Sequence, residues 1–214
     1  MTAPGETTTT DSWTSRLRAR TLESIPADQA LPDRQPAYVA SWIYVFGVAS
    51  LAGLLVVIAT GCWLALAGPA WWHVSGLGLF VNSLHLWSVE LFFFAMVIHL
   101  WGKFWMASWR GNRALTWMTG VVSFLVSIGA AFTGYVSQTN FDSQWITFEA
   151  KDGINSTGVG AFWNVVDLGQ MLLWHVTLLP IGVGLIVVLH LVLVRVRGVV
   201  EPIGIETDGS VSPR

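Results

Sequence analysis

The 214-residue sequence carries little charge and almost no cysteine. Asp, Glu, Lys and Arg make up only 11% of it and hydrophobic residues 53%, whereas an ordinary soluble domain is about a quarter charged. The formal net charge of -2 gives no reason to expect a nucleic-acid partner. The single cysteine, Cys62, lies in an apolar run, which excludes a disulfide framework and a thiolate-held iron–sulfur cluster within this chain. The composition therefore indicates a membrane protein.

Long apolar runs are what the sequence has in place of charge. A transmembrane helix needs about 20 predominantly apolar residues, and four runs supply that length. They cover residues 42–67, 83–107, 114–136 and 168–194. The runs predict an all-α integral membrane four-helix bundle over residues 37–202, surrounded by lipid. A flexible or interfacial extension is expected over 1–36 and a short tail over 203–214.

Three segments outside these runs also carry local predictions. Residues 13–22 suit a short helix lying on the lipid headgroups, and a solvated tail is an equally good interpretation. Pro69 and the Trp71-Trp72 pair favour an interfacial loop between the first two spans. The sequence GINSTGVG at 153–160 is typical of a flexible loop.

The distribution of basic residues predicts the orientation in the membrane. Ten of the eleven Lys and Arg residues fall on one side of a four-span arrangement, and only Lys151 falls on the other. Cytoplasmic loops are enriched in Lys and Arg, so we expect a multi-pass protein of a bacterial plasma membrane with both termini cytoplasmic. The ten are Arg16, Arg18, Arg20, Arg34, Lys103, Arg110, Arg113, Arg195, Arg197 and Arg214.

Four of the five histidines form two matched pairs inside the apolar runs. His85 and His99 are fourteen residues apart, and His175 and His190 are fifteen apart. The two side chains of each pair therefore project from the same face of their helix, at two depths that lie about 21 to 22 Å apart along the axis. A single histidine is usually a hydrogen-bonded core residue, but an ionisable group at membrane depth is a functional candidate. Four in this arrangement predict two haems, each held by two neutral imidazoles.

Two further ionisable residues lie close to this pattern. His73 has no partner at a matching spacing, so we expect a surface residue. Glu90 lies five residues inward from His85, where a carboxylate in lipid would be costly and should face the protein interior. Glu90 is predicted to be either a buried, neutral, hydrogen-bonded acid or part of a proton relay.

Glycines recur at the same interval in the other two spans. Gly47 and Gly61 are fourteen residues apart in the first span, and so are Gly120 and Gly134 in the third. Without a Cβ, a helix backbone can approach a flat macrocycle closely. Small residues are common at membrane helix interfaces, but two pairs in register with the histidines predict haem packing.

These features together resemble the amino-terminal, dihaem half of the cytochrome b family, in its split plastid-like form. The family serves quinol:cytochrome c and plastoquinol:plastocyanin oxidoreductases. The motifs that carry the resemblance are ATG at 59–61, SLHLWS at 83–88, RALTWMTGVV at 113–122, FTGY at 132–135 and HLVLVRVRG at 190–198.

The resemblance assigns roles to the predicted residues. It implies two haem b groups, with His85 and His175 on the iron of an outer, low-potential haem. His99 and His190 would ligate an inner haem of higher potential. Arg113 matches a residue near the inner haem propionates and the inner quinone site.

The sequence also departs from the family pattern at several positions. VSQTNFDSQW at 136–145 replaces a stretch with a Pro-Trp dipeptide that borders the outer quinol site. Asn82 and Leu86 stand where arginines often meet the outer propionates. Val45 replaces the cysteine that holds a third haem in the plastid form, so no covalently attached third haem is expected. The carboxy-terminal half is expected on another chain, or is missing from the complex.

Three functions are consistent with the sequence. The first is a dihaem cytochrome subunit that carries electrons across the membrane between a quinol/quinone site and a redox partner in a respiratory bc-like complex. Its partners would be a Rieske protein and the carboxy-terminal cytochrome b half. The alternative is the haem b subunit of another quinone-linked oxidoreductase, with a molybdenum, nickel or flavin catalytic subunit and no working outer quinol site. The third is a non-redox membrane anchor. No catalytic residue is predicted in this chain.

The two levels can be separated by mutation. His190→Leu should abolish the inner haem and leave most of the outer haem absorbance, because each iron depends on its own pair of imidazoles. Reduced-minus-oxidised spectra of the purified variant measure this. Loss of both haems, or of neither, would contradict the assignment of levels.

Overall fold

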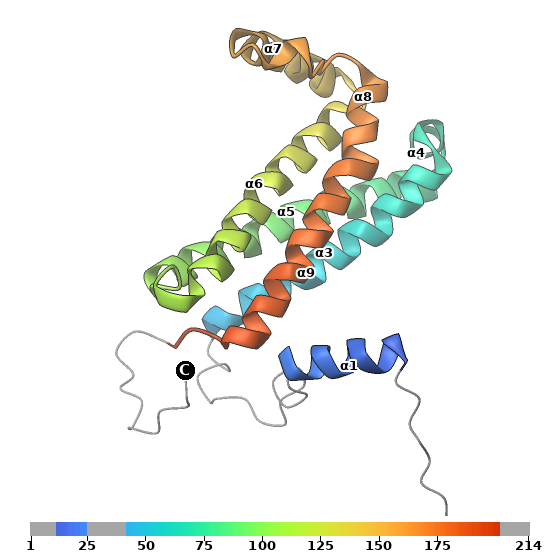
Figure 1. Ribbon diagram of the computed structural model, residues 1–214. Coiled ribbons are helices and arrows are strands. Elements are labelled where there is room, and N and C mark those ends of the chain that lie inside the picture. Colours follow the sequence, from blue (N-terminus) through green and yellow to red (C-terminus); the bar gives the residue numbers. More distant parts are fainter. Residues whose placement is uncertain (1–11, 25–41, 202–214) are drawn as a thin grey trace, which may run out of the picture.

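The computed structural model describes residues 12–24 and 42–201, and no strand occurs within them. Four helical segments are long and apolar enough to cross a membrane: Trp42–Ala67, Gly76–Trp105, Gly111–Val136 and Leu168–Arg197. The predicted all-α four-helix fold is confirmed (Figure 1). The helices are α1 (Trp13–Ser24), α3 (Trp42–Ala67), α4 (Pro69–Val74), α5 (Gly76–Trp105), α6 (Ala114–Val136), α7 (Phe141–Ser156), α8 (Leu168–Leu173) and α9 (Leu179–Arg197).

The spanning helices form two pairs. Contact is most extensive between α3 and α5 and between α6 and α9, and it is sparse between one pair and the other. Figure 1 shows α4, α7 and α8 at one end of the bundle, and the start of α3 and the end of α9 at the opposite end. The side chains that face the space between the pairs therefore decide what the bundle can hold.

An apolar cluster joins the two pairs at mid-height. Phe92 lies seven residues from each histidine of α5, and Val183 lies eight residues after His175 and seven before His190. Between membrane-spanning helices, side chains of this kind stabilise the contact through van der Waals packing, because lipid is as apolar as the core. The cluster separates the two histidine levels. Its buried members are Leu54, Phe92, Met96 and Val183.

The connection between the first two spans is a short helix rather than the predicted loop. Gly68 has a φ of 81°, which ends α3, and Pro69 then occupies the first turn of α4. Proline suits this position because its missing N–H would have had no helical partner. Ser75 caps the next helix by accepting a hydrogen bond from the Gly78 N–H. As a result α5 begins at Gly76, seven residues before the predicted start of the second span.

The segment between the last two spans is also more ordered than expected. Asn140 accepts a 2.8 Å hydrogen bond from the Ser143 N–H and so caps α7. Residues 153–156, predicted to be part of a flexible loop, form the last turn of this helix. Figure 1 shows α7 lying beyond the ends of α6 and α8.

The fourth span contains a wide turn at its histidine. Residues Trp174–Leu178, labelled η4, form a π-helical turn between α8 and α9. Pro180 follows in the first turn of α9. A proline has no N–H to donate to the carbonyl four residues back, and its ring clashes with that carbonyl. Turns of this kind are frequent at functional sites, and His175 lies within this one.

The residues predicted to form a short helix near the amino terminus lie in α1, where Trp13 and Leu17 are exposed. In Figure 1 α1 lies apart from the bundle. The remainder of the predicted extension and the predicted tail lie outside the described residues.

The backbone contact between α4 and α5 gives a stability test. A Cβ on Gly78 would lie 2.7 Å from both the Trp71 carbonyl oxygen and the Trp72 Cα, so α4 would have to move. We expect Gly78→Ala to lower the free energy of unfolding by about 1–3 kcal/mol. Thermal unfolding in detergent measures the change.

Gly184→Ala in α9 is the matched control. No atom lies within 4 Å of a Cβ at that position, so alanine should be neutral or stabilise the helix by about 0.5–1 kcal/mol. Equal effects of the two substitutions would contradict the described packing.

Candidate cofactor site

The structure brings His85 and His175 together across the two helix pairs. Their ring centroids are 6.2 Å apart and the ring planes are 89° to each other. Metal–imidazole bonds are about 2.0–2.1 Å long, and a ring centroid lies about 1 Å beyond its ligating nitrogen. Two imidazoles on opposite sides of one metal therefore have centroids about 6 Å apart. The observed separation matches that requirement.

A cavity of about 760 Å³ opens around these two imidazoles. Its volume falls within the range of about 300–1,000 Å³ of small-molecule and cofactor sites. Its wall is mostly apolar. Besides the two imidazoles, polar side chains come from Asn82, Glu90, Tyr135, Ser137 and Gln138. The cavity therefore suits a large apolar cofactor that carries a metal.

Each of the four predicted glycines lies against one of the four histidines. The rings thus rest on the bare backbone of the neighbouring helix, in places that a Cβ would fill. The prediction was that these glycines make room for a macrocycle, and in the structure they make room for the imidazoles. A Cβ on Gly61 would lie 3.2 Å from His85 Cε1, on Gly120 3.3 Å from His190 Cε1, on Gly47 2.9 Å from His99 Cε1, and on Gly134 against His175 Cε1.

The level of His85 and His175 is called the outer level from here on, and that of His99 and His190 the inner level. Hydrogen bonds at the outer level fix which ring nitrogen of each imidazole carries the proton. Thr60 donates to the Val56 carbonyl oxygen at 2.7 Å, and its Oγ1 lies 2.9 Å from His85 Nδ1. A hydroxyl has one proton, so Thr60 accepts from the Nδ1–H of His85. His175 Nδ1 lies 2.8 Å from the Ala130 carbonyl oxygen, which only accepts. Both rings therefore keep Nε2 unprotonated and free to ligate.

The inner level repeats this arrangement on one side. His190 Nδ1 lies 3.0 Å from Thr119 Oγ1 and 2.9 Å from the Thr116 carbonyl oxygen. Thr119 donates to that same carbonyl at 2.7 Å, so it also accepts from the imidazole. Neither Thr60 nor Thr119 is among the predicted site residues. The signal is a Thr-Gly dipeptide that occurs three times within the apolar runs, at 60–61, 119–120 and 133–134.

His99 is the exception among the four histidines. Phe46, not threonine, precedes the glycine that faces it. In the part of the chain that the structure describes, His99 Nδ1 is buried and has no hydrogen-bond partner. His99 is thus held by packing on Gly47, without the hydrogen bond that orients the other three rings.

Unpaired polar atoms gather at the inner end of the bundle. Arg113 lies in the short turn η2 (Gly111–Arg113), and its Nε is buried without a partner among the described residues. Thr116 Oγ1 and Trp117 Nε1 on the following helix are also buried without a hydrogen-bond partner among the described residues. Lys103 Nζ lies 3.7 Å from the centroid of the Tyr44 ring. Buried donors without partners are costly, so this end is suited to an anionic or carbonyl-bearing group.

The remaining predicted positions lie outside this arrangement or at its edge. His73 is exposed beside Trp72, with ring centroids 5.8 Å apart. Val45 is exposed on α3. Asn82 and Leu86 both line the outer cavity, where the family often has arginines.

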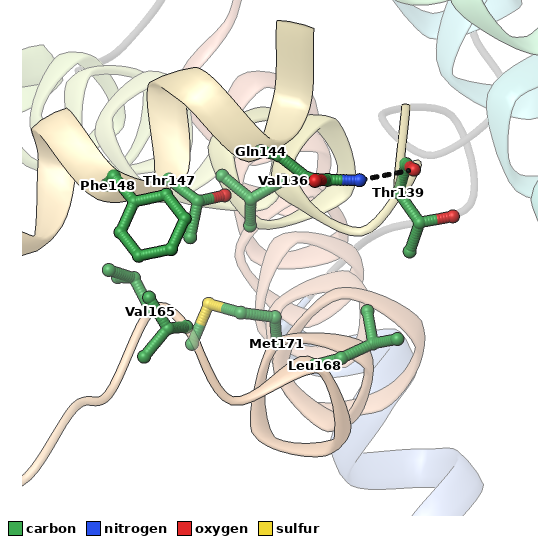
Figure 2. Close-up of a pocket in the computed structure, with 9 residues that line it drawn as sticks. Val136, Thr139, Gln144, Thr147, Phe148, Val165, Leu168 and Met171 are labelled. Carbon is green, nitrogen blue, oxygen red and sulfur yellow. Dashed lines mark hydrogen bonds between the residues drawn. The ribbon is translucent and has the colours of Figure 1, made fainter. Parts of the chain in front are cut away.

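The segment 136–145 forms the end of α6 and the start of α7. A second cavity, of about 330 Å³, lies under α7, with Met171 and Val165 opposite (Figure 2). Gln144 Nε2 donates to the Thr139 carbonyl oxygen at 3.1 Å across its edge. Trp145, the one residue in register with the family here, is exposed and does not line this cavity.

Comparisons with known proteins agree with this geometry. A model of the family described as Cytochrome b(N-terminal)/b6/petB matches residues 90–213. The cytochrome bc complex cytochrome b subunit of Chlorobaculum thiosulfatiphilum is 30% identical over 195 residues, which cover 81% of this chain and 46% of that protein. The chain belongs to the cytochrome b amino-terminal/b6 family. Membership of the cytochrome b family implies that the chain binds haem b.

Two further comparisons bear on the extent of the cytochrome b likeness. Cytochrome b6 of Heliobacterium mobile is 27% identical over 189 residues, which cover 78% of this chain and 89% of that protein. A chain of the hyperthermophilic respiratory Complex III shares the fold, with a TM-score of 0.74, 22% identity, and coverage of 93% of this chain and 57% of that chain. The chain thus spans about half the length of the Chlorobaculum relative and most of the Heliobacterium one.

The contact between Gly134 and His175 gives a test of the outer level. A Cβ at Gly134 would collide with the His175 ring, so Gly134→Ala should displace a proposed haem ligand. Overpacking of this kind costs about 1–3 kcal/mol, and haem binding at this level should weaken by about tenfold or more. Haem content after detergent purification measures the loss.

Gly129→Ala on the same helix is the control. Its Cβ would meet only Leu179 Cδ1, at an ordinary 3.9 Å, so haem content should stay at the wild-type level. Equal haem content in the two variants would argue against His175 as a ligand.

Proposed function

We propose that this chain is a dihaem cytochrome b that conducts electrons across a bacterial plasma membrane. Its membrane domain covers residues 37–202, and both termini are cytoplasmic. His85 and His175 hold the outer haem b, and His99 and His190 hold the inner one. The observation that carries the proposal is the 6.2 Å pair of imidazoles in a cofactor-sized cavity. The second pair, His99 and His190, lies further along the same helices, and each of its rings also faces a glycine.

The bound haems supply reversible one-electron chemistry, and the protein sets its direction. A hydrogen bond from Nδ1–H makes an imidazole a more basic ligand, which favours ferric iron and lowers the potential. Both outer ligands have such a bond, whereas His99 has none among the described residues. Lys103 and Arg113 also place positive charge at the inner end, which favours ferrous iron. Both effects give the inner haem the higher potential, so electrons move inward.

Quinone chemistry at the two membrane surfaces completes the proposed role. Arg113 and the unpaired donors beside it suit the inner haem propionates or a quinone carbonyl. A quinol would donate electrons near the outer level. Val136, Thr139 and Gln144, from the stretch that replaces the family's Pro-Trp segment, line part of the cavity under α7. The missing partner residues of that outer site are expected on the carboxy-terminal half of cytochrome b and on a Rieske protein.

The names of the relatives favour this function over the alternatives. The Chlorobaculum relative is named as a bc complex subunit and the structural neighbour as a respiratory Complex III. A molybdenum, nickel or flavin partner has no support in these names. A non-redox anchor would not need four imidazoles aligned on four glycines.

A pyridine haemochrome assay on protein purified in mild detergent tests the proposal. We expect two haem b per chain and, on addition of a short-chain quinol with the co-purifying subunits present, reduction of both haems. Identification of a Rieske protein and a carboxy-terminal cytochrome b half among those subunits would support the bc-type complex. A haem-free chain, or a single haem per chain, would contradict the conduit.

A further inference from the structure

Glu90 is the acidic residue of the four spanning segments, and the proposed haem ligation leaves it without a role. It lies near the middle of α5, and α3, α6 and the span from Leu168 to Arg197 contain no Asp or Glu. A carboxylate at membrane depth is costly and is retained where it faces a functional cavity. Its presence at this depth therefore calls for a function.

The structure places Glu90 in the wall of the outer cavity. Its side chain is exposed there, beside Val89 and Phe93 and in the same cavity as His85 and His175. No hydrogen bond or ion pair joins Glu90 to another described residue. Of the two sequence predictions, the buried and hydrogen-bonded acid is therefore not what this chain shows.

The other groups that face the cavity cannot take up a proton near neutral pH. No Lys, Arg or Asp occurs among its lining residues; those from α3 and α4 are apolar or tryptophan, and α6 contributes the phenol of Tyr135. A phenol O–H already carries its proton. The imidazoles of His85 and His175 already donate through Nδ1, and their Nε2 atoms are the proposed iron ligands. Among the side chains that line the cavity, Glu90 is the proton acceptor that remains.

The other polar side chains of the cavity lie between Glu90 and the outer end of the bundle, where they could hold water that carries a proton. Asn82, Gln138 and Tyr135 line it together with Glu90. Asn82 lies one turn outward of His85, and Gln138 follows the outer end of α6. Water held by such groups could connect the carboxylate to the outer surface.

We propose that Glu90 takes up one proton when the outer haem iron gains one electron, and releases it when the iron loses that electron. In the forward step ferric iron becomes ferrous and the carboxylate becomes a carboxylic acid, so the net charge of the cavity is unchanged. A hydroquinone supplies both particles, since loss of one electron from it releases one proton. When the outer iron passes its electron on to the inner haem, the carboxylic acid releases its proton toward the outer side. The inference rests on the proposed function, because it needs a haem at the outer level.

Redox titration of the outer haem as a function of pH tests this inference. One proton per electron makes the reduction equilibrium change tenfold per pH unit, which is about 59 mV for a one-electron couple. We expect this slope in the wild-type protein, and its loss in Glu90→Gln. Glu149→Gln is the control, because Glu149 is exposed on α7 and does not line the cavity. It should keep the slope.

The outcomes separate this inference from the function on which it rests. Haem content is measured first, and a haem-free wild-type chain would overturn both. A haem-loaded wild type without the slope, or a Glu90→Gln variant that keeps it, would overturn only the role of Glu90. If Glu90→Gln loses its outer haem, infrared difference spectra of the wild type decide instead. Reduction should then produce a protonated carboxyl band that shifts with carbon-13-labelled glutamate, and absence of that band would reject the proposal.

Discussion

The architecture depends on the close approach of imidazole rings to helix backbone at four glycines. A Cβ at Gly47 or Gly134 would displace the ring that faces it, and a Cβ at Gly61 or Gly120 would push the ring by a few tenths of an ångström. Because each ring rests on the helix that pairs with its own, both helix pairs turn bare imidazole edges toward the space between them. The sparse contact between the pairs and the cavity around His85 and His175 are consequences of that arrangement. The proposed haem ligation uses the space that the glycines and histidines create together.

The apolar cluster around Phe92 gives the bundle its two levels. It joins the helix pairs at mid-height, so each histidine level lies on its own side of a packed core. The levels differ in chemistry. The outer one has two imidazoles with hydrogen-bonded Nδ1 atoms and a carboxylate in its wall. At the inner one, His99 Nδ1 has no hydrogen-bond partner among the described residues, and Lys103 and Arg113 lie at the same end of the bundle. This difference in ligands and charge is the physical basis for the proposed inward path of the electron.

Much of this arrangement could be predicted from the sequence, because helical periodicity relates residues within one span. Spacings of fourteen and fifteen predict histidines and glycines at matching heights, and in the structure each of the four glycines faces one of the four histidines. Contacts between different spans could not be predicted in this way, because helical periodicity does not relate residues of one helix to those of another. The hydrogen bonds of Thr60 and Thr119 join different helices, and only the repeated Thr-Gly dipeptide hinted at them. The helical α4 and the early start of α5 follow from Ser75 capping and from backbone contact at Gly78, which composition does not reveal. The order in α7 likewise depends on the cap at Asn140.

The central claim is that two irons are each held by two histidines, with the outer pair of ring planes close to perpendicular. Electron paramagnetic resonance of the oxidised protein tests it most directly, because perpendicular imidazole planes leave two iron d orbitals nearly degenerate. The account predicts two low-spin ferric signals per chain, with the highly anisotropic form expected from the 89° angle between His85 and His175 in the outer one. High-spin iron, or one low-spin centre per chain, would contradict it.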